Sequence, residues 1–373
     1  MIKEFAFEIS LPATILFNTS LKKLEFPSPW KKEYAIPIGK VNNPESNDDL
    51  RLISLTRFLS KIYEKFIADW ILKYVGDQLD PLQFGGTKGN SITHYMIHLL
   101  NFILSNLDSS SSTGILAAVI DFSKAFNRLC HSRIITIMND LGLPGWLLKL
   151  IASYLSKRVM IVRFKGSESK EENMPGGSPQ GTILGVVIFI LQMILMRSIS
   201  LNPNENFLTI PGEKSPSTSC KFIDDLTSAV SFKIKDLEHS DDLTKPLVYH
   251  SRTQHILPSS KNPLIPELER IVNFTETNKM KLNTKKTSII MFHRSKTRDF
   301  QPELYINDEL LNVVESVKLV GVMLSSDLKW DRNVHYMCQK AQKRLWMLRR
   351  IKDLGGSKED LLCVYLLQIR VLL

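Results

Sequence analysis

The fold is decided by the stretch Leu116-Ala117-Ala118-Val119-Ile120-Asp121-Phe122-Ser123-Lys124-Ala125-Phe126. Its apolar first half is too short for a helix and is rich in small and β-branched residues, which predicts a strand buried on both faces. This strand ends in the carboxyl group of Asp121. A buried carboxylate costs several kcal/mol of folding free energy unless a partner stabilises it. We therefore expect Asp121 either to pair with a positive side chain or to bind a metal ion.

A second acidic site follows in Cys220-Lys221-Phe222-Ile223-Asp224-Asp225-Leu226-Thr227-Ser228-Ala229-Val230. Two strand-like runs flank its Asp pair, which predicts a hairpin with carboxylates at a two-residue turn. The pairs Asp48-Asp49 and Asp241-Asp242 lie in polar surroundings, as is typical of solvated loops. Because strand side chains alternate between faces, we expect Asp224 to share a face with Asp121, and Asp225 to support it or to bind metal only in some states.

The composition is that of a globular protein with a basic surface. The chain has 373 residues, 43% of them hydrophobic and 23% charged, which is enough for about two or three packed subdomains. The net charge of +10 favours a polyanionic partner, although a basic surface without a specific partner is equally compatible with it. The four scattered cysteines form no zinc or disulfide pattern, which suits an intracellular, reducing location in the nucleus or cytoplasm.

Neither a secretory signal nor a membrane partner is expected. Residues 1–10 mix charged side chains into an apolar run, unlike a secretory signal. The most hydrophobic stretch, Ile183–Met196, is interrupted by Gln192 and is shorter than the roughly 20 residues that span a bilayer. It predicts a buried core helix; anchoring in a membrane is the alternative.

Two cations, Lys40 and Arg51, are placed by a predicted hairpin. The strands Tyr34–Ile38 and Arg51–Leu55 flank a long polar loop, and Lys40 directly follows the first strand. Both side chains are compatible with plain solvation on an edge hairpin. Near an acidic centre, however, an Arg fork and a Lys point charge are the groups expected to hold a triphosphate.

Two glycine-rich segments mark places of close approach. Gln83–Gly89 lacks the spacing of a P-loop, so its glycines predict a backbone that comes close to another group, such as a nucleic-acid strand. Pro175–Thr182 opens the apolar helix at Ile183 and leaves backbone N–H groups exposed.

The basic helix Val334–Ile351 is typical of either a nucleic-acid-facing surface or a solvated face. Hydrophobic spacing predicts further helices at 11–24, 56–74, 91–107, 133–141, 144–156 and 264–279, and strands at 159–164, 288–292, 303–306, 310–313 and 317–324.

The order of these segments resembles the reverse transcriptase domain of non-LTR (LINE-type) retrotransposons, from about Leu11 to Ile351. The motifs that carry this resemblance are Ile36-Pro37-Ile38-Gly39-Lys40, Leu50-Arg51-Leu52-Ile53-Ser54-Leu55, Gln83-Phe84-Gly85-Gly86, Asp121-Phe122-Ser123-Lys124-Ala125-Phe126, Gly177-Ser178-Pro179-Gln180-Gly181-Thr182 and Phe222-Ile223-Asp224-Asp225. The chain departs from the usual family pattern at Leu52, Asn127, Ser178 and Phe222, where the family has Pro, Asp, Val and Tyr. None of these positions is a metal ligand in the family.

The resemblance implies an α+β fold with right-hand polymerase architecture, in which an antiparallel palm sheet is backed by helices. It implies that residues 1–115 form an N-terminal helix and the fingers, and that residues 116–165 form the part of the palm with the first catalytic Asp. A fingers/palm loop and helix would follow at 166–200. The palm would continue at 201–325 with the catalytic hairpin and the primer-grip strands, and residues 326–373 would be the start of a truncated thumb.

The same resemblance implies RNA-directed DNA polymerase activity by a two-metal mechanism, with an RNA template, a DNA primer and dNTPs as partners. Two Mg²⁺ ions, replaceable by Mn²⁺, would bind Asp121, Asp224 and Asp225, and the carbonyl of Phe122. Lys40, Arg51, Phe126, Gln180, Gly181 and Lys286 would bind substrates, with Phe126 selecting dNTPs. A separate endonuclease activity would be needed for integration. The alternative is a degenerate remnant that only binds nucleic acid.

Overall fold

The computed structural model describes residues 4–40, 43–109, 113–196, 217–233, 264–293 and 304–372. The pair Asp241-Asp242 lies outside them. The chain divides into two units, the first made of Met1–Leu99, Ile120–Ser228 and Ile265–Asn283, and the second of Leu100–Val119, Ala229–Leu264 and Thr284–Leu373.

The helices of the first unit occur close to the positions that hydrophobic spacing predicts. They are α1 (Ala6–Lys23), α2 (Phe58–Val75), the start of α3 (Ile92–Ser109), α4 (His131–Asp140), α5 (Gly145–Leu155), α6 (Ile183–Met193) and α8 (Ile265–Thr277). The largest difference is at α1, which begins at Ala6 rather than Leu11 and continues through Pro12.

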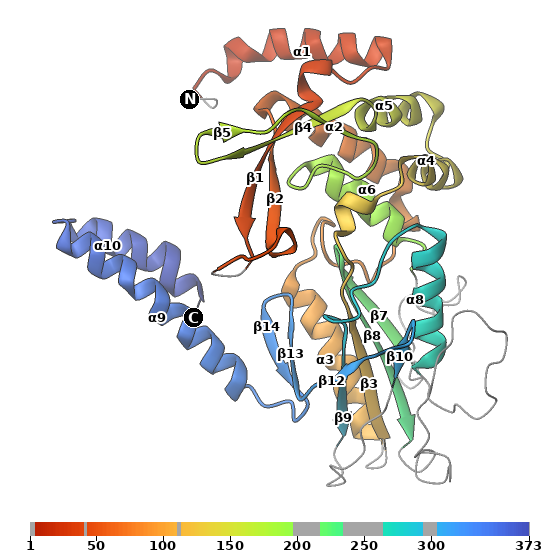
Figure 1. Ribbon diagram of the computed structural model, residues 1–373, viewed down its shortest axis with the longest axis vertical. Helices are drawn as coiled ribbons and strands as arrows, with labels where there is room; N and C mark the ends of the chain where they lie inside the picture. Colours follow the sequence, from red (N-terminus) through yellow and green to blue (C-terminus); the bar gives the residue numbers. More distant parts are fainter. Residues whose placement is uncertain are drawn as a thin grey trace. The chain divides into compact units, whose positions relative to one another are not determined.

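The predicted hairpin of the first unit is confirmed. β1 (Lys32–Gly39) pairs antiparallel with β2 (Leu50–Leu55), which places Arg51 opposite Ile38. On its other side β1 runs parallel to β4 (Arg158–Phe164), and β4 also pairs with the short strands β5 (Ser167–Glu168) and β6 (Glu172–Met174) (Figure 1). The two cation positions are therefore on a hairpin that a wider sheet supports.

The helix α6 is the core of the first unit, as predicted. Its residues Val187 to Met193 are all buried, and α2 is among the elements that pack against it. Its start is fixed by Thr182, whose hydroxyl oxygen accepts a hydrogen bond from the Gly185 N–H at 3.0 Å. No helix in the described ranges is long and apolar enough to cross a membrane.

A five-stranded sheet carries the strand that decides the fold. Its order is β12-β9-β3-β8-β7, with β3 (Thr113–Ile120), β7 (Ser217–Phe222), β8 (Asp225–Lys233), β9 (Ser288–His293) and β12 (Asn312–Val313) (Figure 1). β3 pairs antiparallel with β9, whereas the short β12 is parallel to β9. Residues of both faces of β3, from Ile115 to Ala118, are buried, which confirms the prediction of a strand covered on both sides.

The end of the second unit contains two hairpins. β10 (Tyr305–Ile306) and β11 (Glu309–Leu310) turn at Asn307-Asp308, where both residues have positive φ. The prediction of a single strand at 317–324 was wrong. Val320 and Gly321 both have positive φ, so the segment folds into β13 (Ser316–Leu319) and β14 (Val322–Ser325).

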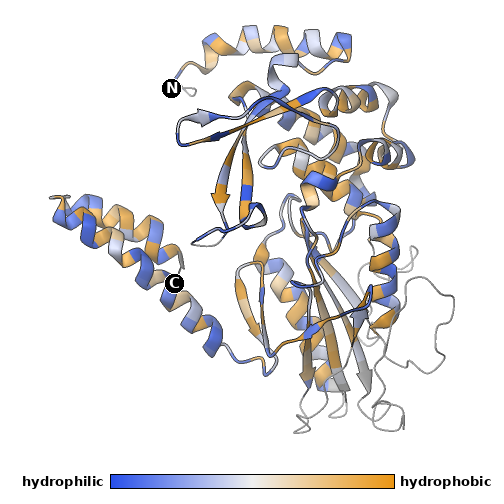
Figure 2. Ribbon diagram, in the orientation of Figure 1, coloured by the Kyte–Doolittle hydropathy of each residue, from blue (hydrophilic) through white to orange (hydrophobic). Residues whose placement is uncertain are grey.

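The second unit ends in helices. α9 (Asp331–Asp353) packs against β14 and is followed by α10 (Lys358–Val364), the π-helix η5 (Tyr365–Ile369) and the short 3₁₀-helix η6 (Arg370–Leu372). Hydrophilic and hydrophobic residues alternate along α9 (Figure 2), and only Ala341 of this helix is buried. The predicted basic helix is thus confirmed as a helix with most of its surface open to solvent.

Candidate active site

Asp121 directly follows β3 and is half-buried. Two hydrogen bonds join it to Asn283: the Asn283 backbone N–H donates to the Asp121 carbonyl oxygen at 2.8 Å, and the side-chain Nδ2 donates to Oδ2 at 2.8 Å. A neutral amide thus holds the carboxylate, a partner that the sequence did not predict.

Phe122 lies in a short antiparallel pairing with Leu282. The backbone bonds of this pairing are made by the neighbours, Asn283 to Asp121 and Ser123 to Lys281, both at 2.8 Å. The pairing therefore does not use the carbonyl of Phe122, the group predicted as a metal ligand. The Phe122 side chain is buried.

The hairpin of β7 and β8 forms as predicted, but its turn is shifted by one residue. The two turn residues are Ile223 and Asp224, and Asp225 is the first residue of β8. Ile223 has a φ of 61°, a conformation that is a clear outlier for a β-branched residue. The backbone at the turn is strained, and strain of this kind persists where the surrounding structure enforces it.

The loop Gln83–Gly89, from here on the glycine-rich loop, holds this turn in its conformation. The Phe84 N–H donates to the Lys221 carbonyl and the Lys221 N–H to the Leu82 carbonyl, both at 2.8 Å. A Cβ atom at Gly85 would lie within 2.8 Å of atoms of Phe222 and Ile223, and one at Gly86 would meet Ile190 of α6 at 2.5 Å. The close approach predicted for these glycines is thus made by the chain itself, and a nucleic-acid strand is not needed to explain it.

The charges of Asp121 and Arg51 act on the ionisation of Asp224 and Asp225. Burial, and then the charge of Asp121, raise the pKa of Asp224, while Arg51 opposes the shift. Asp225 keeps part of its surface in solvent, but desolvation of its carboxyl group and the charges of Asp224 and Asp121 raise its pKa to about 6. The structure therefore brings together residues that are up to 104 positions apart (225 minus 121). Their mutual repulsion favours a bound cation.

The donors of this cluster suit a hard divalent cation, because all of them are oxygen atoms. Among the described residues, however, no group of three or more His, Cys, Asp or Glu side chains already has the arrangement of a metal site. The fit of the residues to a metal thus rests on their charge and donor type.

The predicted triphosphate contacts are both exposed. Arg51 is close enough to the acidic cluster to lower the pKa of both Asp224 and Asp225. Lys40 follows the end of β1, where its backbone N–H donates to the Asp49 carbonyl at 2.7 Å. Arg51 is thus electrostatically coupled to the acids.

Gln180 and Gly181 lie in the loop before α6, and this loop is tied to β2. The Ser54 N–H donates to the Gln180 carbonyl at 3.0 Å, and Gly181 has a φ of 107°. Behind the loop, the buried carboxylate of Glu64 accepts hydrogen bonds from the N–H groups of Ile183 and Leu184 at 3.1 and 3.3 Å. A negative charge at a helix N-terminus is favourable, so Glu64 fixes the start of α6 and the loop that precedes it.

Phe126 is held between two elements of the first unit. Its ring stacks on Phe189 of α6, with centroids 5.0 Å apart, and its carbonyl accepts a hydrogen bond from the Ser178 N–H at 2.8 Å. A Cβ atom at Gly177 would lie 2.9 Å from Asn127. Phe126 is therefore locked to the loop that carries Gln180.

Lys286 is exposed in the turn before β9 and belongs to the second unit. Its role near a leaving pyrophosphate stays a prediction.

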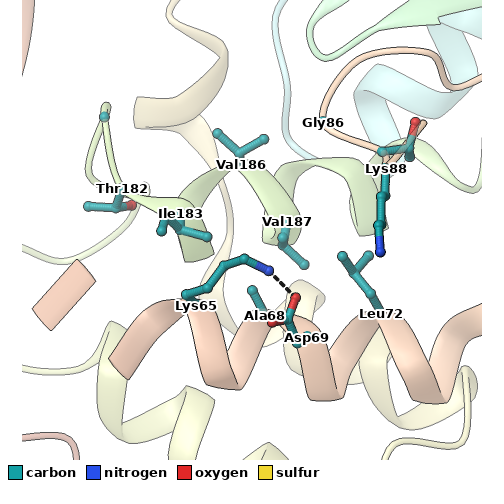
Figure 3. Close-up of a pocket in the computed structure, with 12 residues that line it drawn as sticks. Lys65, Ala68, Asp69, Leu72, Gly86, Lys88, Thr182, Ile183, Val186 and Val187 are labelled. Carbon is teal, nitrogen blue, oxygen red and sulfur yellow. Dashed lines mark hydrogen bonds and ion pairs between the residues drawn. The ribbon is translucent and has the colours of Figure 1, made fainter. Parts of the chain in front are cut away.

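A hollow of about 680 Å³ borders Gly181 and Thr182. Its apolar surface comes from α2 and α6, including Leu72, Val186 and Val187 (Figure 3). Lys65, paired with Asp69, and Lys88 from the glycine-rich loop add charge. The volume lies within the range of small-molecule sites.

Two residues that shape this site, Asn283 and Glu64, were missed from sequence. At Gly85 the glycine pattern predicted a close approach, but not that Ile223 is the neighbour. Only the fold brings Asn283 to Asp121, since 162 positions separate them.

Comparisons with known proteins place the chain in a family. A family model described as "Reverse transcriptase (RNA-dependent DNA polymerase)" matches residues 38–338. The chain is 32% identical over 178 residues to the "Probable RNA-directed DNA polymerase from transposon BS" of Drosophila melanogaster, covering 47% of this chain and 19% of the relative. It is 25% identical over 353 residues to the "Probable RNA-directed DNA polymerase from transposon X-element" of the same organism, covering 93% of this chain and 35% of the relative. The chain thus spans about a third or less of the length of these relatives.

A solved structure of apo telomerase from Candida tropicalis, truncated from its C-terminal domain, aligns with a TM-score of 0.45 and 11% identity over 86% of this chain and 59% of that one.

Proposed function

Because the chain belongs to the reverse transcriptase (RNA-dependent DNA polymerase) family, we propose that it is the RNA-directed DNA polymerase of a non-LTR retrotransposon. It would add dNTPs to the 3′-OH of a DNA primer along an RNA template. The observation that supports this proposal most directly is the electrostatic coupling of Asp121, Asp224 and Asp225, which come from the ends of β3 and the β7–β8 hairpin.

In this proposal Asp121 and Asp224 hold the divalent cations, with Asp225 beside them and the carbonyl of Phe122 as a further ligand. Two Mg²⁺ ions would lower the pKa of the primer hydroxyl and neutralise the leaving pyrophosphate. Mn²⁺, which takes the same hard oxygen ligands, would substitute. The residues of the chain themselves position the groups and form no covalent intermediate.

The substrate contacts follow from the surroundings of the acids. Arg51 and Lys40 would bind the triphosphate, since Arg51 already interacts with the acidic cluster. Gln180 and Gly181 would support the template and the incoming nucleotide, beside the hollow that Lys65 and Lys88 line. Phe126, fixed by Phe189 and Ser178, would exclude a ribose 2′-OH. Lys286 would act near the pyrophosphate.

The proposal also assigns the fingers, palm and thumb of a polymerase to ranges of the chain. Residues 1–115 would provide the N-terminal helix and fingers. Palm elements would lie at 116–165 and 201–325, with a fingers/palm loop and helix between them at 166–200. α9 would begin the thumb at 326–373. Integration would also require an endonuclease activity, which the proposal assigns to a separate domain or protein.

The decisive experiment is primer extension on poly(rA)/oligo(dT) with Mg²⁺ or Mn²⁺, comparing the chain with Asp224→Ala. The proposal expects incorporation by the first and none by the second. Incorporation of dTTP at the same background level by both would end the polymerase proposal, and salt-sensitive binding of the duplex by both would then indicate nucleic-acid binding alone.

A further inference from the structure

The first turn of α6 is capped from inside the protein by Glu64 of α2. This side chain is 1% exposed, and its Oε2 atom accepts hydrogen bonds from the N–H groups of Ile183 and Leu184 at 3.1 and 3.3 Å. Its Oε1 atom accepts a bond from the Ser60 hydroxyl at 2.9 Å, which restricts the rotation of the carboxylate. The two N–H groups are therefore already bound to an internal negative charge, the kind of group that a helix N-terminus otherwise binds from solution.

Thr182, the residue before α6, ties the same turn to its surroundings. Its hydroxyl oxygen accepts hydrogen bonds from the Gly185 N–H and the Tyr154 hydroxyl at 3.0 and 3.1 Å, and the hydroxyl donates to the Pro179 carbonyl at 3.0 Å. On the other side of the loop, β2 donates to the Gln180 carbonyl. The loop before α6 is thus bonded to α5 and β2, and the helix that follows it is bonded to α2.

Glu64 contributes a charge to this arrangement as well as its acceptor atoms. The N–H groups at the start of a helix carry partial positive charge, so a carboxylate binds them more strongly than a neutral oxygen does. A buried carboxylate is costly when its hydrogen bonds are lost. Any movement of α6 away from α2 would break these bonds, so the carboxylate favours one position of the helix start and of the loop directly before it.

We propose that Glu64 is a positioning residue for the incoming nucleotide, which acts through the loop residues Gln180 and Gly181. This inference rests on the proposed function, in which those two residues support the template and the nucleotide. Discrimination between matched and mismatched nucleotides depends on how closely the site fits the correct one. Glu64 therefore contributes to the affinity for dNTP and to the accuracy of incorporation, although its burial keeps it from contacting the nucleotide.

The test compares Glu64→Met, which removes both acceptor oxygens, with Glu64→Gln, which keeps an acceptor for the two N–H groups, in the full chain. Glu276→Met, at an exposed position of α8 in the same unit, is the matched control. A displacement of about 1 Å costs on the order of 100-fold in rate, so kcat/KM for dTTP on poly(rA)/oligo(dT) should fall by roughly 10- to 100-fold in Glu64→Met, mainly through KM. Glu64→Gln should keep most of the activity, and Glu276→Met all of it.

Three readouts separate positioning from a general loss of folded protein. Fewer folded molecules lower the maximal rate and leave KM unchanged, so a raised KM reports a change in the site itself. Incorporation of a mismatched dNTP relative to dTTP should rise in Glu64→Met and stay normal in Glu64→Gln. Hydrogen–deuterium exchange of the peptide that contains Ile183 and Leu184 should be faster in Glu64→Met than in Glu64→Gln, with no change in the peptides of α8.

The outcomes distinguish this inference from the proposed function. A normal KM for dTTP in Glu64→Met, or unchanged exchange at the start of α6, overturns the inference and leaves the polymerase proposal standing. Loss of the cooperative melting transition in both Glu64→Met and Glu64→Ala also overturns it, since Glu64 then serves folding. If the unaltered chain extends no primer, the proposed function itself fails, and the inference fails with it.

Discussion

A Cβ atom added to Gly85 would lie 2.6 Å from the backbone nitrogen of Ile223, so the glycine-rich loop is in direct backbone contact with the turn that carries Asp224. Ile223 has a positive φ of 61°, which costs free energy for a β-branched residue. The hydrogen bonds of Leu82 and Phe84 with Lys221 hold the same loop against β7. The loop and the turn therefore form one packed unit.

Gly85→Ala should reduce primer extension far more than it reduces stability. The added methyl group must push the Ile223 turn away, and a displacement of about 1 Å at a catalytic group costs on the order of 100-fold in rate. The measurement is the single-turnover extension rate together with the melting temperature. Gly145→Ala is the control, since nothing lies within 4 Å of a Cβ there. A Gly85→Ala protein that extends primers at the normal rate would show that the loop does not set the turn.

The buried ion pair of Lys221 and Asp80 should be important for the stability of the same region. Lys221 is 0% exposed and Asp80 is 2% exposed, and Lys221 also donates to the Met196 carbonyl at 2.6 Å. Burial lowers the pKa of Lys221, an effect that Asp80 opposes. Removing one partner leaves an uncompensated buried charge.

Asp80→Ala should therefore lower the free energy of unfolding by about 3–5 kcal/mol, as measured by urea denaturation. Asp77→Ala, at an exposed position just before it, should change stability by less than about 0.5 kcal/mol. The double variant Asp80→Leu with Lys221→Met should recover part of the loss, because neither charge is then buried. Equal stability of Asp80→Ala and Asp77→Ala would contradict this account.

Local patterns in the sequence were sufficient to predict the elements that carry the acids. The apolar run before Asp121 predicted β3, and the apolar runs on both sides of Asp224-Asp225 predicted the β7–β8 hairpin. Burial on both faces of β3 followed from its continuous hydrophobicity. These features depend on residues that are close together in the chain, so the spacing of hydrophobic residues predicts them directly.

Details that depend on backbone conformation or on distant contacts were not predicted. The turn at Ile223-Asp224, rather than at the Asp pair, depends on a positive φ at an isoleucine, which residue preferences argue against. The split of 317–324 at Val320-Gly321 has the same origin. The hydrogen bond of Asn283 with Asp121 joins positions 162 apart, and no local pattern reports such a contact.

The raised pKa of Asp225, about 6, makes the metal-free protein sensitive to pH. The value is above the ordinary 3.8, so between about pH 4 and 6 the folded state binds a proton that the unfolded state has released. The stability contributed by this group is present at low pH and is lost as the pH rises through 6. Metal binding has the opposite dependence, because it needs the ionised carboxylates.

Asp225→Asn should therefore raise the melting temperature in EDTA at pH 7.5 and have a much smaller effect at pH 4.5. With Mn²⁺ present, the unaltered chain should gain affinity for the ion as the pH rises from 5 to 7. Asp140→Asn, at an exposed position of α4, is the control and should show neither effect. A melting temperature that falls at pH 7.5 upon Asp225→Asn would contradict the repulsion between the three carboxylates.

Gln192→Met should stabilise the protein. Gln192 is 0% exposed within the apolar helix α6, and neither its amide nitrogen nor its amide oxygen has a hydrogen-bond partner among the described residues. An unsatisfied buried polar group costs about 1–3 kcal/mol, and Met has nearly the same length and flexibility without polar atoms. We expect the free energy of unfolding, from urea denaturation, to rise by about 1–2 kcal/mol. Gln342→Met, at an exposed position of α9, makes the same chemical change without burial and should leave stability nearly unchanged. Because α6 directly follows the Gln180 loop, a stable Gln192→Met protein that lost primer extension would indicate that this amide serves the site rather than the core.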